Sequence, residues 1–217
     1  MASQPFITTG KLTGLLSDRL SGPLPGQEAQ FRMAPRSDKG IPDRGVPPQL
    51  ARRSGVMLLL FEDETGPELV LTLRSGSLNH HGNQLSLPGG RAEHGEQMVD
   101  AALRETHEEV GIDPGTISIL GQLTPLHVPV SGNIIYPVVG WIDHQPVLIP
   151  DHREVAEAFT LPLSLLFDSS RLKHTRRELH GTEYNIPYWD VHRIPLWGAT
   201  AMILSEFCEL LVDISEQ

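Results

Sequence analysis

Residues 90–112, GRAEHGEQMVDAALRETHEEVGI, are the stretch that decides the fold. From Glu96 to Val110 the chain has one glycine-free and proline-free run that is rich in Ala, Glu, Met and Leu, which predicts a helix. Gly111 follows at once, and a glycine directly after the last helical residue is typical of a helix end. We therefore expect a helix over 96–110 that ends at Gly111.

This predicted helix has one apolar and one acidic side. At about 100° per residue, four positions lie within about 60° of one another and form the expected core face: Val99, Leu103, Thr106 and Val110. Glu105, Glu108 and Glu109 fall on the other side at i, i+3 and i+4, where like charges repel by a few tenths of a kcal/mol per pair. Two interpretations stay open: a solvated acidic face, or oxygen ligands for a hard divalent cation.

The neighbours of the three glutamates favour the cation. Arg104 precedes them and can reach Glu108 one turn later, and Glu96 stands where the helix dipole favours a carboxylate. Pro88, Gly89 and Gly90 predict a sharp turn whose backbone can approach a ligand closely.

Gly90, Glu96 and the run RETHEEVGI at 104–112 resemble the Nudix box, G-x5-E-x7-R-E-U-x-E-E-x-G-U, where U is a bulky apolar residue. Every fixed charged and glycine position matches, and Thr106 is the one departure, a β-branched residue whose hydroxyl can bond a carbonyl one turn earlier. The resemblance implies an α/β (α+β) fold, a Nudix-type α/β/α sandwich with a mixed β-sheet, and metal-dependent hydrolysis of a nucleoside diphosphate linked to another moiety.

Carried over position by position, the resemblance implies that Glu105, Glu108 and Glu109 bind Mg²⁺ or Mn²⁺, with a carbonyl from Gly89 or Gly90. Arg104 orients these glutamates, and Glu96 supports the loop. Such a metal neutralises the pyrophosphate and activates a water that attacks phosphorus. The general base is left open between a box glutamate and Glu154 or Glu157, which are equally compatible with a helix surface.

A second resemblance narrows the substrate. LTLRS at 71–75, followed by LPGG at 87–90, is similar to the coenzyme A diphosphatase motif L-L-T-x-R-[SA]-x3-R-x3-G-x3-F-P-G-G, with Val70, Asn79, Asn83 and Leu87 as departures. REVAEAFTLPL at 153–163 and IPLWGATA at 194–201 resemble further segments of that subgroup. The implied substrate-binding residues are Arg74, Ser75, Gly89, Gly90 and Arg91. Asn79 stands where the motif has its second arginine, and Gly82 and Arg91 are near enough in sequence to compensate for that loss.

The implied reaction cuts coenzyme A, or an acyl derivative, into 3′,5′-ADP and 4′-phosphopantetheine. Two rivals remain: hydrolysis of ADP-ribose or another nucleoside diphosphate derivative, such as a dinucleoside polyphosphate, and a Nudix-like module that senses a nucleotide without cutting it. The three retained glutamates oppose the last, because a binding module does not need three mutually repelling carboxylates.

The rest of the chain organises around this stretch. We expect residues 1–50 to form an N-terminal helix and an irregular arm, and 51–217 to form the hydrolase domain. Strands are expected at 55–61, 69–74, 117–123 and 134–142, with 147–149 as a further candidate. Helical turns are expected at 154–159 and 163–167, and a closing helix at 199–212.

Composition excludes several classes of protein. The 217 residues hold 17 Lys and Arg against 27 Asp and Glu, a net charge of −10, which opposes a dedicated binder of nucleic acid or of an anionic membrane. The single Cys208 excludes an intrachain disulfide and a cysteine-built zinc site. The longest apolar run, Val56–Phe61, is far short of the ~20 residues that span a bilayer. We expect a cytoplasmic protein whose partner is a small nucleotide, with a homodimer left open.

Three groups of residues keep two interpretations each. The basic cluster of Arg171, Lys173, Arg176 and Arg177 either meets a 3′-phosphate or forms a solvated loop. The aromatic residues Tyr184, Tyr188 and Trp189 either stack on an adenine or belong to the core. His80 and His81 either contact substrate or face water.

Overall fold

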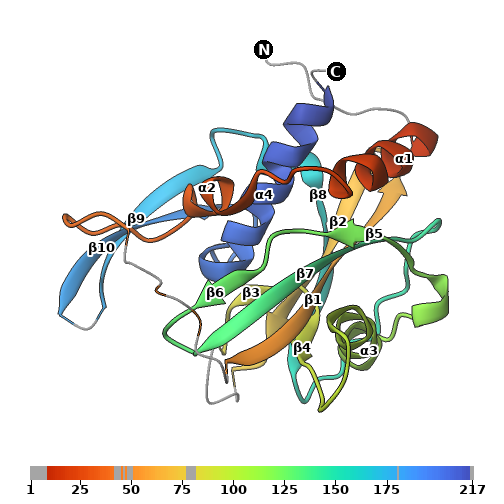
Figure 1. The fold of residues 1–217 in the computed structure, drawn as a ribbon, viewed down its shortest axis with the longest axis horizontal. Helices are drawn as coiled ribbons and strands as arrows, with labels where there is room; N and C mark the ends of the chain where they lie inside the picture. Colours follow the sequence, from red (N-terminus) through yellow and green to blue (C-terminus); the bar gives the residue numbers. More distant parts are fainter. Residues whose placement is uncertain are drawn as a thin grey trace.

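A mixed eight-stranded sheet is the centre of the molecule (Figure 1). The computed structural model describes residues 9–41, 45, 47, 51–76, 82–179 and 181–215; Asn79, His80 and His81 lie outside them. The strand order is β3-β2-β1-β7-β5, with β4 also paired to β1, β6 to β7 and β8 to β2. Only β1 and β7 run parallel; the other pairs of this sheet are antiparallel.

The strands of the sheet have these bounds: β1 Arg52–Asp63, β2 Gly66–Arg74, β3 Leu85–Ser86, β4 Gly89–Arg91, β5 Ser118–Gln122, β6 Leu126–Val128, β7 Asn133–Trp141 and β8 Val155–Pro162. The helices are α1 Thr9–Leu20, α2 Gly26–Phe31, α3 Met98–Val110 and α4 Gly198–Ser215, with single 3₁₀ turns η1 at Pro114–Thr116 and η2 at Leu163–Leu166. A separate hairpin consists of β9 Leu172–Leu179 and β10 Thr182–Trp189. Among the described residues, no helix combines the length and apolar character that crossing a membrane requires.

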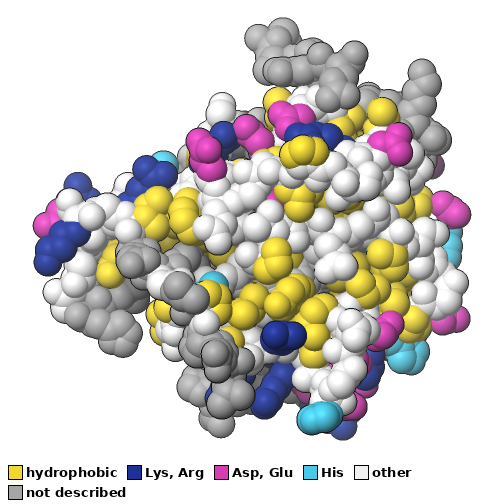
Figure 2. All heavy atoms as spheres, viewed as in Figure 1, with side chains coloured by type: hydrophobic (Ala, Val, Ile, Leu, Met, Phe, Trp, Pro, Cys, Tyr) yellow, Lys and Arg dark blue, Asp and Glu magenta, His cyan; other side chains and the backbone are white. Residues whose placement is uncertain are grey.

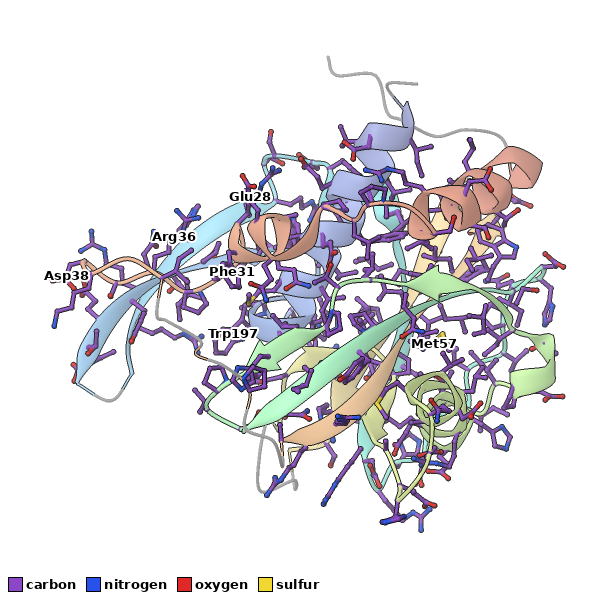
Figure 3. All side chains as sticks on the ribbon, in the orientation of Figure 1. Glu28, Phe31, Arg36, Asp38, Met57 and Trp197 are labelled. Atoms are coloured by element: carbon purple, nitrogen blue, oxygen red, sulfur yellow. The ribbon has the colours of Figure 1, made fainter. Side chains whose placement is uncertain are left out.

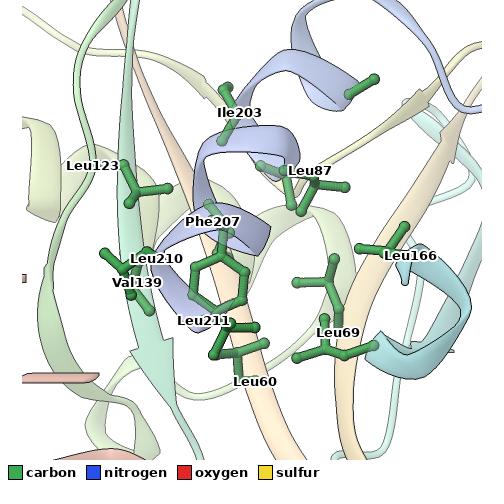
Figure 4. Close-up of a cluster of buried hydrophobic side chains, with 14 of the residues drawn as sticks. Leu60, Leu69, Leu87, Leu123, Val139, Leu166, Ile203, Phe207, Leu210 and Leu211 are labelled. Atoms are coloured by element: carbon green, nitrogen blue, oxygen red, sulfur yellow. The ribbon is translucent and has the colours of Figure 1, made fainter. Parts of the chain in front are cut away.

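Helices cover both faces of the sheet, which confirms the expected sandwich (Figure 1). Strand β1 shows why: its alternate residues point to opposite faces, and Met57, Leu59 and Phe61 pack in the cluster that contains Val110 of α3. Leu58 and Leu60 belong instead to the cluster that contains Phe207 of α4, and Figure 4 shows Leu60 and Phe207 in it. All five β1 side chains are fully buried, as a continuous apolar strand requires.

Helix α3 lies close against β1. An added Cβ at Gly55 would come within 2.2 Å of the Met98 carbonyl oxygen, so only glycine permits this approach. Figure 3 shows Met57 between the sheet and this helix. The expected core face is buried at Thr106 and Val110 and half-buried at Val99 and Leu103, and Ala101 and Ala102 add to it.

The helix begins two residues later than we expect from the sequence, at Met98 instead of Glu96. The Glu96 side chain accepts the backbone N–H of Glu93, which holds residues 93–96 in a turn before the helix. The predicted end is confirmed: Gly111 adopts φ 75°, in the left-handed region, and its N–H donates to the His107 carbonyl.

The helical turn expected at 154–159 is wrong. These residues belong to β8 and its approach, which pairs antiparallel with β2 from Val155 to Pro162. The local Ala and Glu content favours a helix, but the edge of β2 offers a full row of hydrogen-bonding partners, and tertiary pairing overrides the local preference. The candidate strand at 147–149 is wrong too, since these residues have no regular structure. The strands expected at 55–61, 69–74, 117–123 and 134–142 and the closing helix are confirmed, as is a short helical turn within 163–167.

The basic cluster lies on a β-hairpin and not on a loop, and the side chains of Lys173, Arg176 and Arg177 are exposed to solvent, as the solvated interpretation expects. Figure 2 shows Lys and Arg side chains on the surface where Figure 1 places this hairpin. Lys173, Arg176 and Arg177 belong to β9, which projects from the body of the molecule with β10 (Figure 1). Arg36 of the N-terminal arm pairs with Asn185 of β10, and Figure 3 shows it beside the hairpin. Trp189 is buried and donates its indole N–H to the Leu166 carbonyl, which favours the core role for this residue.

Candidate active site

The contact between α3 and β4 builds the site. An added Cβ at Gly90 would lie 2.3 Å from the Cδ atom of Glu105, so the carboxylate of Glu105 rests directly on the strand. One residue earlier, the Gly89 N–H donates to Glu109 Oε2 at 3.0 Å, with Gly89 at φ 148°. The two glycines therefore let two helix carboxylates meet the backbone of β4 without side-chain obstruction.

Glu109 is only 3% exposed, so the expectation that it faces outward with the other two glutamates is wrong. Its carboxylate lies against Gly89 of β4 and Arg74 of β2, while the segment at 149–151 binds the end of the helix through N–H bonds from Ile149 and Asp151 to the Val110 and Glu109 carbonyls. Burial raises the pKa of Glu109 to about 7. The Gly89 N–H and the Arg74 charge work against this rise, and the carboxylates of Glu105 and Glu154 add to it.

Arg104 organises the opposite side of the site. Its guanidinium donates to Glu96 at 2.9 Å, to Glu105 at 2.9 Å and to Glu108 at 3.1 Å, and also to the Arg91 carbonyl at 3.1 Å. The bond from Arg104, together with the Glu93 N–H, lowers the pKa of Glu96. Burial raises the pKa of Glu105 in spite of Arg104, and Glu108 and Glu154 raise it further. Glu108, 57% exposed at its side chain, is the most solvated of the three glutamates.

Arg74 connects the two sequence motifs. Its guanidinium lies 3.4 Å from Glu109 Oε1, across 35 positions in the chain. The next residue, Ser75, donates its N–H to the Glu154 carbonyl at 2.8 Å, which ties the end of β2 to the start of β8. Neither link follows from the spacing of the motifs. The packing of α3 on the sheet creates the first, and the pairing of β2 with β8 creates the second.

The structure places Glu154 and Glu157 in different environments. Glu154 lies near enough to Glu105 and Glu109 to raise the pKa of both. Glu157 instead pairs with Arg193 at 2.5 Å and with His192 at 3.6 Å, and these partners lower its pKa. Only Glu154 therefore belongs to the carboxylate group at the box.

The remaining predicted residues can also be placed. Thr106 donates its hydroxyl to the Ala102 carbonyl at 2.6 Å, as the sequence suggests. Arg91 contributes its carbonyl to Arg104, whereas its side chain is exposed at the end of β4, beside Arg52 and Arg53. Of the predicted substrate-binding residues, Arg74, Ser75, Gly89 and Gly90 gather around Glu109 and Glu154, and Arg91 lies beyond them.

The donor set fits a hard divalent cation. Glu105, Glu109 and Glu154 are oxygen donors. The charge of Glu154 raises the pKa of both Glu105 and Glu109, and a bound cation relieves this repulsion. Within the described ranges, no three His, Cys, Asp or Glu side chains already converge as a metal-binding group. Because Arg104 holds Glu105 and Glu108, binding requires these side chains to exchange part of that contact for the cation.

Comparisons with known proteins agree with this geometry. Residues 51–180 match the family model described as NUDIX domain. An uncharacterized Nudix hydrolase, NudL, from Pectobacterium atrosepticum is 33% identical over 180 residues, which is 77% of this chain and 90% of the relative. Nudix hydrolase 15, mitochondrial, from Arabidopsis thaliana is 33% identical over 75% of this chain and 58% of its own length.

Two solved structures share the fold. A Nudix hydrolase from M. smegmatis, RenU, has a TM-score of 0.53 and 17% identity, covering 83% of this chain and 94% of its own. A MutT/nudix family protein from Enterococcus faecalis has a TM-score of 0.51 and 18% identity, covering 96% of this chain and 76% of its own. At this level of identity the likeness concerns the fold alone.

Proposed function

The chain belongs to the Nudix hydrolase family, and we propose that it hydrolyses coenzyme A or an acyl derivative, with Mg²⁺ or Mn²⁺, to 3′,5′-ADP and 4′-phosphopantetheine or its acyl form. The observation that carries the proposal is the contact of Arg74 with Glu109. It brings the arginine of the coenzyme A motif to the carboxylates of the box, where a substrate pyrophosphate has to lie.

Each residue has a definite role in this proposal. Glu105, Glu108 and Glu109 hold the cation with the Gly89 carbonyl, and when bound the cation supplies positive charge against the pyrophosphate and makes a water more acidic. Arg74 binds a phosphate oxygen through its planar guanidinium, with Ser75 and Gly90 beside it. Arg104, anchored on Glu96, holds Glu105 and Glu108 in place.

We assign the general base to Glu154. A carboxylate that takes a proton from the attacking water has to lie beside the ligands without being consumed by an ion pair. Glu154 meets both conditions through its effect on Glu105 and Glu109, whereas Glu157 is engaged by Arg193. A Glu154→Gln variant is expected to lose kcat much more than it changes KM, and an unchanged kcat would reject the assignment.

The domain boundary at residue 50 and a cytoplasmic location belong to the same proposal. The family match begins at residue 51, and the first 41 residues contribute α1 and α2 as helices on the outside of α4 and β5. The lone Cys208 suits a reducing compartment.

The test is a substrate panel with purified protein: coenzyme A, ADP-ribose, NADH and diadenosine polyphosphates, each with Mg²⁺ or Mn²⁺ and with chelator, and with products separated by chromatography. We expect coenzyme A to give 3′,5′-ADP and the reaction to stop with chelator. Preferred turnover of ADP-ribose or a dinucleoside polyphosphate would replace the coenzyme A proposal with the alternative that the departures at Asn79, Asn83 and Leu87 favour. Tight binding of one compound without turnover of any would indicate a sensor.

A further inference from the structure

The pairing of β2 becomes irregular at its last residue, Arg74. On the β3 side the ladder is regular as far as Leu73, which pairs with Leu85. At the next position the Arg74 N–H donates to the Gln84 carbonyl at 3.0 Å, whereas the Arg74 carbonyl accepts the N–H of Asn83 at 3.1 Å. Two residues therefore oppose one, which is the arrangement of a β-bulge.

Asn83 supplies the backbone conformation that this bulge needs. Its φ of 59° lies in the left-handed region, and among the described residues no other residue except glycine has a positive φ. The first residue of such a bulge is commonly a left-handed glycine, and asparagine and aspartate are the other residues that adopt this conformation most readily. Glycine stands at the same position in the coenzyme A motif, so Asn83 keeps the conformation although it changes the residue.

The two segments that meet at the bulge are in close contact. An added Cβ at Gly82 would lie 3.1 Å from the Ser75 carbonyl oxygen. An added Cβ at Gly76 would lie 3.0 Å from the side-chain amide of Asn83, which therefore rests directly on Gly76. A change of conformation at Asn83 is thus transmitted to the backbone at Arg74 through packing as well as through the hydrogen bond.

A second irregularity lies on the opposite edge of β2. There Leu73 pairs with Glu157, but Arg74 pairs with Val155. Ala156 is therefore an extra residue in β8. Bulges bend and twist a strand locally, and beside active sites they change the direction of a side chain. Arg74 is the residue of β2 at which both irregularities meet.

Alternation along β2 selects the face toward which Arg74 points, and the bulges then adjust its direction. Val70 lies in the core cluster beside α3, and Arg74, four positions later, points to the same face. Its guanidinium reaches Glu109 Oε1 at 3.4 Å. The Arg74 side chain is 25% exposed, so it can contact Glu109 and still offer donors to a phosphate.

We propose that Asn83 is a positioning residue for the hydrolysis: its left-handed backbone forms the bulge that aims the Arg74 guanidinium at Glu109 and at a phosphate of the substrate. Asn83 acts only through Arg74 and does not itself contact the substrate. This inference rests on the proposed function for the reaction, but it is the same for coenzyme A and for another nucleoside diphosphate derivative.

A double-mutant cycle tests the proposal with the compound of the substrate panel that the wild type hydrolyses fastest. Arg74→Gln should lower kcat/KM by roughly 10- to 100-fold, the worth of one hydrogen bond to a charged group. Asn83→Val should lower it by roughly 10-fold, because a positive φ is strongly disfavoured for a β-branched residue. Asn83→Gly should retain the activity, because glycine adopts a positive φ freely. In the Arg74→Gln protein, Asn83→Val should cause no further loss.

The matched control is Gly132→Val, in the turn between β6 and β7. Gly132 has φ 61°, and an added Cβ there would meet no atom within 4 Å. The variant carries the same kind of backbone strain two strands away from β2, so it should lower the melting temperature and leave kcat/KM near that of the wild type. Wild-type activity in Asn83→Val, equal losses in Asn83→Val and Asn83→Gly, or additive losses in the double variant would overturn the proposal.

A structural measurement makes the test independent of turnover. In crystals of metal-free Asn83→Val, the distance from Arg74 Nη1 to Glu109 Oε1 should lengthen beyond hydrogen-bonding range, and in Asn83→Gly it should be kept. An unchanged distance in Asn83→Val would overturn the proposal. Asn83→Ala, which disfavours the same conformation less severely, takes the place of Asn83→Val if that variant does not fold. If no compound of the panel is hydrolysed, the proposed function fails, and these distances alone decide the role of Asn83.

Discussion

Glu109 and Glu206 are two buried carboxylates on helices that pack against opposite faces of one sheet, and their surroundings differ. Glu206 of α4 is fully buried and accepts three hydrogen bonds, from the Gly26 N–H at 3.1 Å, the Gln30 side chain at 2.8 Å and the Thr124 N–H at 3.2 Å. Glu109 of α3 accepts one N–H bond, from Gly89, has a longer contact with Arg74, and lies near two other carboxylates.

This difference in surroundings indicates a different role for each carboxylate. A buried charge costs several kcal/mol unless hydrogen bonds satisfy it, and Glu206 is satisfied by α2 and by the segment after β5. It therefore fastens the N-terminal arm to the domain. Glu109 has fewer hydrogen-bond donors and lies among other negative charges. Without a cation this arrangement destabilises the folded protein, and a bound cation would stabilise it.

The largest expected effect comes from removing the charge of Glu109. Glu109→Gln should lower kcat/KM by about 10²- to 10³-fold, since one preorganised charge at a reaction centre is typically worth that much. The melting temperature of this variant should equal or exceed that of the wild type, because the substitution removes a buried negative charge that neighbouring carboxylates repel. Steady-state kinetics and thermal denaturation measure the two effects.

Glu108→Gln should also abolish turnover while the fold stays intact. Full activity in both the Glu108→Gln and the Glu109→Gln variant would reject the assignment of these residues as metal ligands.

Glu206→Ala should show the opposite pattern. It leaves buried N–H groups without an acceptor, and we expect the free energy of unfolding to fall by about 3 kcal/mol. Urea denaturation measures this change. Activity at low temperature should stay near that of the wild type, because the residue does not touch the box. A stability equal to the wild type would mean that the arm is not fastened by this residue.

Metal binding should affect the thermal stability of the Glu109 and Glu206 variants differently. A saturating divalent cation, at about 100 times its dissociation constant, stabilises the folded state by about 2.7 kcal/mol. Mg²⁺ or Mn²⁺ should therefore raise the melting temperature of the wild type and of Glu206→Ala alike. The shift should be small or absent in Glu109→Gln. An equal shift in all three proteins would place the cation elsewhere.

The smallest effect is expected for Glu157, a carboxylate that is neither deeply buried nor near the box. Arg193 and His192 lower its pKa, so its stabilising contribution is present above the unfolded value of about 4.3 and is lost as the pH falls through the folded value. Glu157→Gln should cost about 0.5 kcal/mol at pH 7. The difference from the wild type should shrink in chemical denaturation as the pH falls below the unfolded value. A difference that grows on acidification would contradict this sign.

Local signals predicted much of the fold. The apolar run at Val56–Phe61 and the helix that ends at Gly111 are both found, because a strand buried on two faces and a glycine-terminated helix leave their marks in neighbouring residues. The short strands β3, β4 and β6 were not predicted. Two or three residues are too few to show a period, and pairing with longer strands alone defines them. The same holds for β8, whose helical composition yields to the edge of β2.

For the candidate site, the sequence identified the residue types and their order but not their environments. The bond from Thr106 to Ala102 and the pair of Arg104 with Glu108 follow from helix geometry, and both are present. The burial of Glu109 does not, because its partners Gly89 and Arg74 lie 20 and 35 positions away in the chain.

The sequence by itself therefore determined the family and the helix with its three glutamates, since both are contained in one continuous stretch, residues 90–112. Only the tertiary structure decided which carboxylates share one environment. The pairing of β2 with β8 brings Glu154 to the box and leaves Glu157 with Arg193, two different environments for glutamates three positions apart. The physical reason is that burial and the distance between charges are set by strands that meet only after the chain has folded.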